Sequence, residues 1–390
     1  MTLKSKDFSY FLPEDLIAQI PSSQRDESRL LLCQSWDRKI TDEMFSNIPE
    51  ILHKLYDEHL PKLMIVNNSR VYPARVRIQR QTGARGEVFF LNNAQDEVFS
   101  VLLRPLSKLK KGEVLFSDED NKIPLFIVEN LDPPRVTLVN KEKSLKDTLS
   151  EYGEMPLPPY IIRDKNKVKI NPEMDKERYQ TVYSNIHLDG SCAAPTAGLH
   201  FTQNIIHECV EKNIHFVNTT LHVGLGTFAP VQTEKIRDHK MHEEIYLIPS
   251  VTLKKIDEFL KNNWPIFFVG TTALRSIESF LRLVFPQYSY AEIQECAKKN
   301  LFLDRVSQYQ EQWQKTKLFI YPTNLTEQIL PKIGQGIVTN FHQPESTLCM
   351  LVAALMGSDF WEEFYNHAIE KKYRFLSYGD SSLLLFRSKV

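Results

Sequence analysis

A short turn with two threonines, Gly270-Thr271-Thr272, is the segment of this sequence best suited to bind an anion. It follows an apolar run at 264–269 that predicts a buried strand, and it opens a predicted helix that carries Arg275. A strand, a short turn and a helix N-terminus together present free backbone N–H groups, and the threonines add two hydroxyls. We therefore expect a site for an anion such as a carboxylate here.

Two loops rich in small residues, at 190–202 and 222–231, predict a second binding feature. Gly, Ala, Pro, Ser and Thr dominate the first loop, and such side chains allow a backbone to approach a ligand closely. Thr202 is placed to cap a helix, a strand is predicted at 214–221, and the second loop follows that strand. The spacing alone leaves two alternatives open, which are a ligand site and a pair of tight turns.

Histidines also cluster, because seven of the eleven fall between His187 and His242. His239 and His242, with Glu243 and Glu244, could suit zinc or manganese, but no H-E-x-x-H pattern is present and we expect no metal site. The sequence also contains no G-x-S-x-G, G-x-G-x-x-G or P-loop pattern. Serine hydrolases and the common nucleotide folds are therefore disfavoured.

The composition is that of a soluble globular protein of 390 residues, with 42% hydrophobic and 25% charged residues. No window is apolar enough for a membrane span and the N-terminus is too charged for a secretory signal, so we expect a cytoplasmic protein. Five scattered cysteines without a C-x-x-C pair predict reduced thiols. The net charge of −1 means that any RNA contact must come from a local basic patch.

Polar loops follow predicted strands at four places, and these strands position the candidate site residues. Besides the two segments described above, residues 63–66 lead into Asn67-Asn68-Ser69-Arg70, and residues 336–339 lead into a loop at 340–345. Because the carboxyl ends of parallel strands meet at one edge of a sheet, we expect one composite cleft there.

Six alternating runs between residues 74 and 138 predict a small all-β domain, most simply a barrel. The expected organisation is an α/β main domain at 1–72 and 156–390 with this barrel-like domain at 73–155 inserted into it. Basic residues at its edge could contact phosphates or form a solvated face. Near the N-terminus, a short helix is predicted at 12–19, and the charged segment at 25–29 could form surface ion pairs or hold an anionic ligand.

Several long motifs, taken in order, closely resemble those of one family. They are GSCAAPTAGLHFT at 190–202, TLHVGLGTF at 220–228, HKMHE at 239–243, VGTT at 269–272 with Arg275, TNFH at 339–342 and YRFLSYGD at 373–380. LPEDLIAQ at 12–19, RDESRL at 25–30 and VNNSRVYPAR at 66–75 match as well. Over nearly its whole length the chain resembles the S-adenosylmethionine:tRNA ribosyltransferase-isomerases of queuosine biosynthesis, the QueA family. Thr323, Gln343 and a longer segment at 285–313 depart from the family pattern.

The resemblance implies that S-adenosylmethionine is consumed as a substrate and is not a bound cofactor. Its ribosyl part would be transferred to the aminomethyl group of a 7-deazaguanine at the tRNA wobble position. The ribose would be rearranged to give epoxyqueuosine, and adenine and methionine would leave. Such a reaction needs proton transfer, for which His222, His342 and Asp380 are the candidates, with hydrogen-bonding or structural roles as the alternative for each.

The resemblance also assigns expected binding roles. The Gly270 turn with Arg275 would hold the methionine carboxylate, small residues at 193–198 would pack around the donor, and Asn67, Asn68 and Arg70 would face the deazaguanine or the anticodon. The further substrate-binding candidates are Pro195, Thr196, Gly198, His200, Gly224, Gly226, Thr227, Thr271, Thr272 and Asn340. The candidates for tRNA phosphates are Arg75, Arg77 and Arg104. A tRNA methyltransferase and a non-catalytic RNA-binding module are the rival functions.

Overall fold

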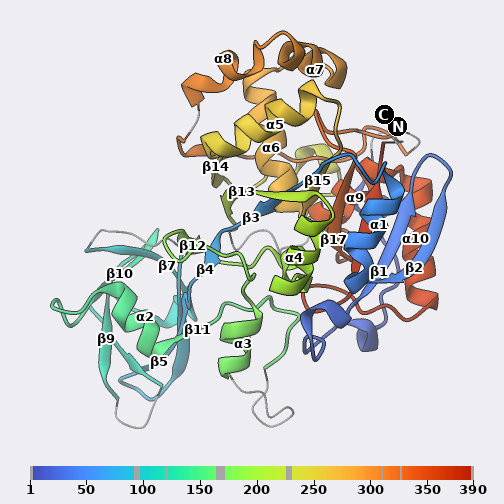
Figure 1. Cartoon of the computed structure of the whole chain (residues 1–390). Coiled ribbons are helices and arrows are strands. Elements are labelled where there is room, and N and C mark those ends of the chain that lie inside the picture. Colours follow the sequence, from blue (N-terminus) through green and yellow to red (C-terminus); the bar gives the residue numbers. More distant parts are fainter. Residues whose placement is uncertain are drawn as a thin grey trace.

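Two large β-sheets dominate the molecule: a nine-stranded sheet with a hydrophobic core on each face, and a seven-stranded sheet with a core of its own (Figure 1). The computed structural model describes residues 3–91, 97–118, 122–163, 172–224, 231–309, 311–325 and 327–387. No helix within these ranges is long and apolar enough to cross a membrane.

The main sheet has nine strands, and its central four are parallel. Its order is β16 (Gln314–Thr316), β14 (Glu244–Leu247), β13 (Ile214–His222), β3 (Lys62–Asn67), β15 (Ile266–Val269), β17 (Gly336–Asn340), β18 (Ser381–Leu385), β1 (Arg29–Gln34) and β2 (Lys39–Met44). Strands β13, β3, β15 and β17 run in the same direction, whereas β18 and β1 run opposite to them. The carboxyl ends of the four parallel strands therefore meet the amino ends of β18 and β1 at one edge.

Both faces of this sheet are covered by helices. In β3, Leu63 and Ile65 belong to one core cluster while Met64 and Val66 belong to another, as expected for a strand whose successive side chains point to opposite faces. The first cluster is covered by α5 (Ser250–Lys261), α6 (Thr271–Val284), α9 (Thr347–Met356) and α10 (Ser358–Glu370). The second is covered by α1 (Ile48–Leu55) and α4 (Gln203–Glu211).

The predicted helix starts are confirmed at α4 and α9. Thr202 and Ser346 each accept a hydrogen bond from a first-turn backbone N–H, and Gly270 stands at the N-cap of α6. The helix predicted at 12–19 is wrong, since only a 3-10 turn, Glu14–Leu16, forms. The backbone there bonds to Phe375 instead, through the carbonyl of Leu16 and the N–H of Ala18.

The second sheet confirms the inserted barrel. Its strands β5 (Arg75–Arg80), β6 (Arg85–Phe90), β7 (Phe99–Arg104), β10 (Pro134–Leu138), β9 (Pro124–Leu131) and β8 (Val114–Ser117) are antiparallel neighbours in that order. The barrel closes where β8 pairs with β5, with Ile78 opposite Ser117. Helix α2 (Leu145–Tyr152) packs Leu145 and Leu149 against its core. Strand β11 (Gly153–Glu154) extends the sheet at β5.

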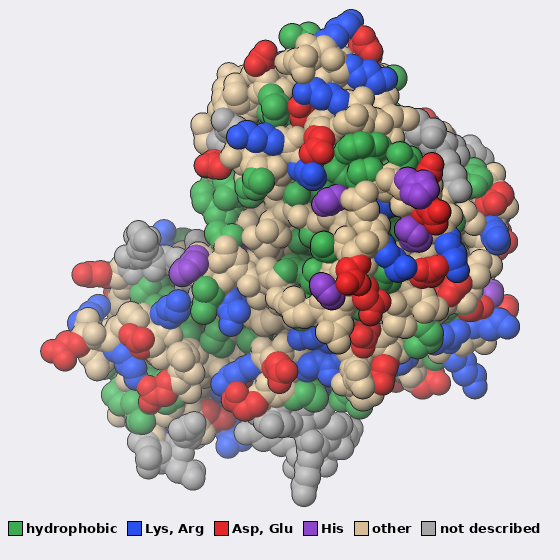
Figure 2. Space-filling view, in the orientation of Figure 1, with side chains coloured by type: hydrophobic (Ala, Val, Ile, Leu, Met, Phe, Trp, Pro, Cys, Tyr) green, Lys and Arg blue, Asp and Glu red, His purple; other side chains and the backbone are tan. Residues whose placement is uncertain are grey.

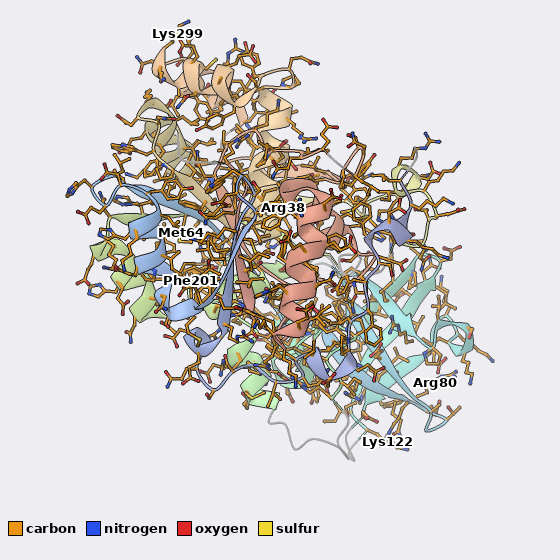
Figure 3. All side chains as sticks on the ribbon, turned by 90° about the vertical axis from the view of Figure 1, so that its right-hand side faces the viewer. Arg38, Met64, Arg80, Lys122, Phe201 and Lys299 are labelled. Atoms are coloured by element: carbon orange, nitrogen blue, oxygen red, sulfur yellow. The ribbon has the colours of Figure 1, made fainter. Side chains whose placement is uncertain are left out.

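Short elements join the two parts. Strand β4 (Arg70–Val71) leaves β3 and pairs in parallel with β12 (Asp189–Ser191), and α3 (Pro172–Arg178) lies on the return path. The barrel and the helical layer of α7 (Tyr290–Lys298) and α8 (Phe302–Val306) lie at opposite ends of the molecule (Figures 1 and 3). In Figure 3, Arg80 marks the barrel and Lys299 the far end, while Met64 and Phe201 lie in the core between them. The exact domain limits stay a prediction.

Candidate active site

A cleft of about 640 Å³, including its open side, lies at the sheet edge where the four parallel strands end. Loops after β15 and β17 supply much of its wall. The rest comes from the start of the 3-10 helix Thr196–His200, with the residues just before it, and from the segment before β18. The lining residues are Tyr160, Ala194, Pro195, Thr196, Ala197, Val223, Gly270, Thr271, Thr272, Thr339, Asn340, Phe341, His342, Gln343, Ser346, Leu348, Leu376 and Ser377. None of these lining residues is an aspartate, glutamate, lysine or arginine, so the described wall of the cleft carries no formal charge.

The N-terminus of α6 opens into this cleft. Gly270 adopts φ +87°, a conformation suited to glycine, and as the N-cap it has no side chain that could cap the first-turn N–H groups. The Oγ1 of Thr272 is buried and has no hydrogen-bond partner in the described part of the chain. A buried hydroxyl beside free N–H groups at a helix N-terminus is suited to a ligand carboxylate.

Asn340 connects three segments of the cleft wall. Its Oδ1 accepts from Thr196 Oγ1 at 2.9 Å, while its Nδ2 lies within 3.1–3.3 Å of His200 Nε2 and of the carbonyls of Leu376 and Asp380. Because the carbonyls require the amide nitrogen on that side, Asn340 donates to His200 Nε2 and the imidazole is neutral. Burial, followed by the charges of nearby arginines, lowers the pKa of His200 to about 3, which agrees with this assignment.

His342 is the imidazole that lines the cleft. Its Nε2 shares a hydrogen bond with Thr339 Oγ1 at 2.9 Å, and its backbone is held by Tyr365 and Tyr10. Burial lowers the pKa of His342 to about 3, so the ring is uncharged near neutral pH. Of the three predicted acid–base candidates, His342 is the one that lines the cleft.

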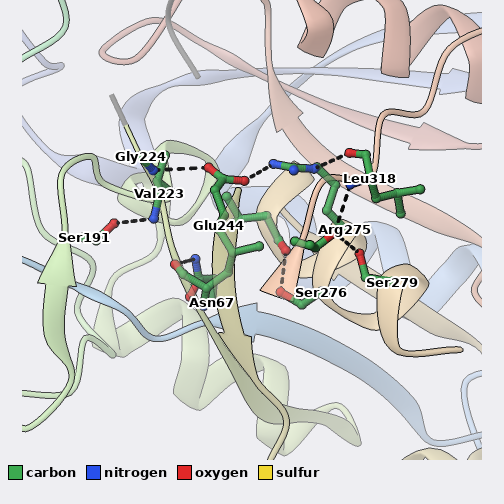
Figure 4. A network of polar contacts seen from close by, with 12 residues as sticks. Asn67, Ser191, Val223, Gly224, Glu244, Arg275, Ser276, Ser279 and Leu318 are labelled. Atoms are coloured by element: carbon green, nitrogen blue, oxygen red, sulfur yellow. Dashed lines mark hydrogen bonds and ion pairs between the residues drawn. The ribbon is translucent and has the colours of Figure 1, made fainter. Parts of the chain in front are cut away.

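A buried ion pair lies behind the cleft. Arg275 Nη1 is 2.5 Å from Glu244 Oε2, and both side chains are about 3% exposed (Figure 4). Glu244 also accepts from the backbone N–H of Gly224 at 3.2 Å, and Arg275 donates to the Leu318 carbonyl. Arg275 is not among the residues that line the cleft, and its Nη1 binds Glu244, whereas its buried Nη2 has no hydrogen-bond partner among the described residues. Its predicted role beside the ligand carboxylate stays a prediction.

The start of the second small-residue loop is fixed by neighbouring strands. Ser191 Oγ accepts from the Val223 N–H, and Asn67 exchanges two hydrogen bonds with the Leu221 backbone (Figure 4). The ring of His222 stacks on Trp313 with centroids 5.0 Å apart. Gly226 and Thr227, two predicted substrate-binding residues, lie outside the described residues.

Other predicted site residues lie away from the cleft. Asn67 and Asn68 are buried; Asn67 bonds to the Leu221 backbone through both amide atoms, and Asn68 accepts a hydrogen bond from Thr220 through its Oδ1. Their predicted contact with the deazaguanine or the anticodon stays a prediction. Asp380 accepts from the backbone N–H groups of Arg29 and Arg374, which occupies both of its oxygens. A Cβ on Gly198 would lie 2.0 Å from Tyr183 Oη, so this glycine serves packing. Arg70 is half-buried at the junction of the sheets, where it contacts Ser184.

The three barrel arginines predicted to contact tRNA all have acidic partners. Arg75 and Arg104 pair with Glu87, and Arg77 pairs with Glu154 at 2.7 Å. Basic and acidic side chains are interspersed over the barrel face in Figure 2. This pattern favours the solvated-face alternative, although Arg104 remains 76% exposed.

Two cleft residues, Tyr160 and Ser377, are not among those predicted from the sequence. Both line the cleft, and their hydroxyls lie 2.6 Å apart. Tyr160 ends the proline-rich stretch at 155–160, which the sequence marks only as a stiff connection, so no local pattern shows that it returns to the cleft. Of the departures from the family pattern, Gln343 lines the cleft, whereas Thr323 is exposed and bonds to Glu327.

A comparison with known protein families identifies the family of this chain. Residues 5–384 match the family model described as queuosine biosynthesis protein. The chain belongs to this family. The match extends from the first 3-10 helix to the last strand, so the barrel and the main sheet both lie within the queuosine biosynthesis fold.

Curated relatives in the queuosine biosynthesis family share the full length. Proteins named S-adenosylmethionine:tRNA ribosyltransferase-isomerase are 40% identical in Thermosipho melanesiensis and 38% identical in Thermotoga maritima, each covering 98% of this chain and 100% of the relative. The protein of that name from Treponema denticola is 38% identical over 98% of this chain and 99% of its own. A solved structure described as an S-adenosylmethionine tRNA ribosyltransferase from Thermotoga maritima is 29% identical, with a TM-score of 0.49, over 97% of this chain and 100% of that chain.

Proposed function

We propose that this queuosine biosynthesis protein is an S-adenosylmethionine:tRNA ribosyltransferase-isomerase. It transfers the ribosyl part of S-adenosylmethionine to the 7-aminomethyl-7-deazaguanine at the tRNA wobble position and rearranges it to epoxyqueuosine, with release of adenine and methionine. The observation that carries this proposal is the full-length family match, together with full-length relatives of that enzyme name. S-adenosylmethionine is consumed as a substrate, and the reaction requires no bound cofactor.

The donor occupies the cleft with its methionine carboxylate at the N-terminus of α6. The free N–H groups there and the unpartnered Oγ1 of Thr272 supply hydrogen bonds to the anion. The glycine and alanine surfaces at Gly270, Ala194 and Ala197 leave room for the rest of the donor. Arg275 has a positioning role, since its ion pair with Glu244 holds α6 against β14, the strand that carries Glu244.

A neutral wall suits the charges of the two substrates. The donor is a sulfonium cation, and the acceptor amine is an ammonium until it loses a proton. A protonated histidine beside them would be repulsive, whereas the low pKa of His342 keeps its ring neutral, so that the ring can hydrogen-bond to the substrates without repelling them. His342 is the predicted acid–base residue that lines the cleft, and Thr339 orients its ring. Because a group with a pKa of about 3 is a weak base, we assign His342 a hydrogen bond to the acceptor amine rather than removal of its proton.

A neutral, partly enclosed site also strengthens electrostatic effects on the donor. Removal of a proton next to the sulfonium gives an ylide, whose opposite charges attract more strongly where water is sparse. Thr271 and Ser377 line the cleft, and their hydroxyls supply hydrogen bonds to the ribose and the leaving adenine.

The test is one incubation of the protein with S-adenosylmethionine and a tRNA carrying the aminomethyl-deazaguanine, followed by mass spectrometry of the small molecules and of the digested tRNA. Adenine, methionine and an epoxyqueuosine nucleoside are expected together. S-adenosylhomocysteine would instead identify a methyltransferase. An intact donor with bound tRNA would identify an RNA-binding module, and either result overturns the proposal.

A further inference from the structure

A second pocket lies next to the cleft and contains two arginines. Its lining residues are Pro21, Ser22, Arg25, Arg178, Leu199, His200, Ser377, Tyr378 and Gly379. Ser377 lines both the cleft and this arginine pocket. His200 also lines the pocket, and it bonds to Asn340 on the cleft side. A wall of two polar side chains therefore separates the arginine pocket from the proposed donor site.

Neither arginine of this pocket has a carboxylate partner in the described part of the chain. Arg25 donates to the carbonyls of Glu177 at 2.9 Å and Leu199 at 3.1 Å, and Arg178 donates to the carbonyls of Ser22 at 2.8 Å and Ser23 at 3.0 Å. The Nε of Arg178 is buried and has no hydrogen-bond partner among the described residues. Carbonyls position both side chains but leave their charges uncompensated.

Two neighbouring arginines have acidic partners, whereas the guanidinium of Arg374 bonds to the Ile20 carbonyl and has no carboxylate partner among the described residues. Arg163 binds Asp175 through two hydrogen bonds of 2.8 and 2.9 Å, and Arg29 pairs with Asp42 at 3.4 Å. The barrel arginines described above are paired in the same way. The sequence left two alternatives for Arg25, a surface ion pair and an anionic ligand, and the structure shows no ion pair for it among the described residues.

The charges of the arginines in this pocket shift the pKa values of neighbouring groups. Burial lowers the pKa of Arg25, and the nearby Arg178 lowers it further, while Glu177 offsets part of this effect without forming an ion pair. Arg25 and Arg374 also contribute to the low pKa of His200. Two neighbouring, half-buried guanidinium groups repel each other, and an oxyanion with several acceptor oxygens would relieve this repulsion.

We infer that the arginine pocket binds a phosphodiester group of the tRNA backbone beside the nucleotide that enters the cleft. This inference rests on the proposed function, because it takes tRNA as the substrate. A guanidinium pair matches the geometry of a phosphate, and the donor carboxylate already has a site at the N-terminus of α6, on the other side of the His200–Ser377 wall. A phosphate held here fixes the position of the backbone and leaves the neighbouring base free to enter the cleft.

The test places a competing carboxylate in the pocket. In Ser22→Asp the new side chain pairs with the arginines without removing their bonds to the backbone. Ser23→Asp adds the same charge one residue away, on an exposed side chain that does not line the pocket, and serves as the control. Because Ser23 donates a hydrogen bond to Glu27, this control should be slightly less stable than the unmodified protein, whereas Ser22→Asp should match or exceed it. Thermal unfolding of both variants, with binding measured well below their midpoints, therefore separates a binding defect from misfolding.

Affinity for the tRNA is measured between 50 and 200 mM KCl. Over this roughly four-fold range of salt concentration, the slope of log affinity against log salt reports the number of phosphate contacts. Ser22→Asp should weaken tRNA binding about ten-fold and reduce the slope of log affinity against log salt by about 0.7 to 1, the change expected for loss of one phosphate contact. Ser23→Asp should stay within about two-fold. Binding of S-adenosylmethionine should be unchanged in both variants.

Three outcomes overturn the inference. Equal tRNA affinities and slopes for Ser22→Asp and the unmodified protein would exclude a phosphate in this pocket. Equal losses in both aspartate variants would show a general charge effect. Weaker binding of S-adenosylmethionine with unchanged tRNA binding would assign the pocket to the donor carboxylate. Failure of the proposed function is separately visible, because the unmodified protein would then bind tRNA without releasing adenine.

Discussion

Asn340 donates a hydrogen bond from its amide nitrogen to His200 Nε2, 3.1 Å away, and this contact links the donor cleft to the arginine pocket. The same amide nitrogen faces the carbonyls of Leu376 and Asp380, so neither its orientation nor the imidazole tautomer is free to change. The other ring nitrogen of His200 donates to Ser28 Oγ at 2.7 Å. The wall between the two pockets is therefore rigid and uncharged.

Asn340→Asp should destabilise the protein by about 1–3 kcal/mol, because an acceptor oxygen would then face His200 Nε2 and two carbonyls in a buried site. Chemical denaturation at pH 7 measures this. Gln343→Glu is the matched control, since it changes an amide to a carboxylate in the cleft wall where no such network is present in the described contacts. Equal stabilities of Asn340→Asp and the unmodified protein would contradict the assigned orientation.

Thr272→Ala should raise the KM for S-adenosylmethionine about ten-fold, the usual effect of losing one hydrogen bond to a charged group. Its stability should be unchanged, because the hydroxyl has no hydrogen-bond partner in the described part of the protein. Thr272→Ser keeps the hydroxyl and should retain a near-normal KM. Normal affinity of Thr272→Ala for S-adenosylmethionine would contradict the proposed position of the methionine carboxylate at the N-terminus of α6.

Glu244→Gln should lower the free energy of unfolding by about 3–5 kcal/mol, because it leaves the buried guanidinium of Arg275 without its counter-charge. The double variant Glu244→Leu with Arg275→Met should regain much of this loss, since neither charge is then buried. Urea unfolding of the three proteins measures the coupling. If the single and double variants were equally unstable, the ion pair would not be the cause.

Stability should fall as the pH is lowered from about 6.5 towards 3. His200 and His342 both have a folded-state pKa of about 3, below the unfolded value, so the unfolded chain binds more protons in this range. Each histidine contributes a slope of up to about 1.4 kcal/mol per pH unit, and its stabilisation is fully present above the unfolded pKa. His342→Gln should reduce the slope measured by denaturation at several pH values. An unchanged slope would show that His342 titrates normally.

Much of the fold could be predicted from the sequence because local patterns determine it. The alternating runs of the barrel, the apolar strands such as β3 and the caps at Thr202 and Ser346 each follow from side-chain periodicity or from hydrogen bonding within a few residues. Three of the four predicted strand ends, those of β13, β15 and β17, line the cleft, since parallel strands bring their carboxyl ends together. The helix predicted at 12–19 failed because bonds to Phe375, far away in the chain, replaced the helical ones.

The sequence by itself determined the family motifs, the inserted barrel and the Gly270 turn at the N-terminus of α6. Only the tertiary structure decided which polar side chains are free. Asn67 and Asp380 have the right chemistry for a site, but their side chains bond to backbone groups, among them those of Leu221 and Arg29, which lie far from them in the sequence. Arg275 Nη1 binds Glu244, whereas its Nη2 has no hydrogen-bond partner among the described residues. Arg25, in contrast, stands beside acidic residues in the sequence yet pairs with none of them in the described structure. Spacing along the chain sets local conformation, whereas the satisfaction of a buried polar group depends on which distant atoms the fold brings within hydrogen-bonding distance.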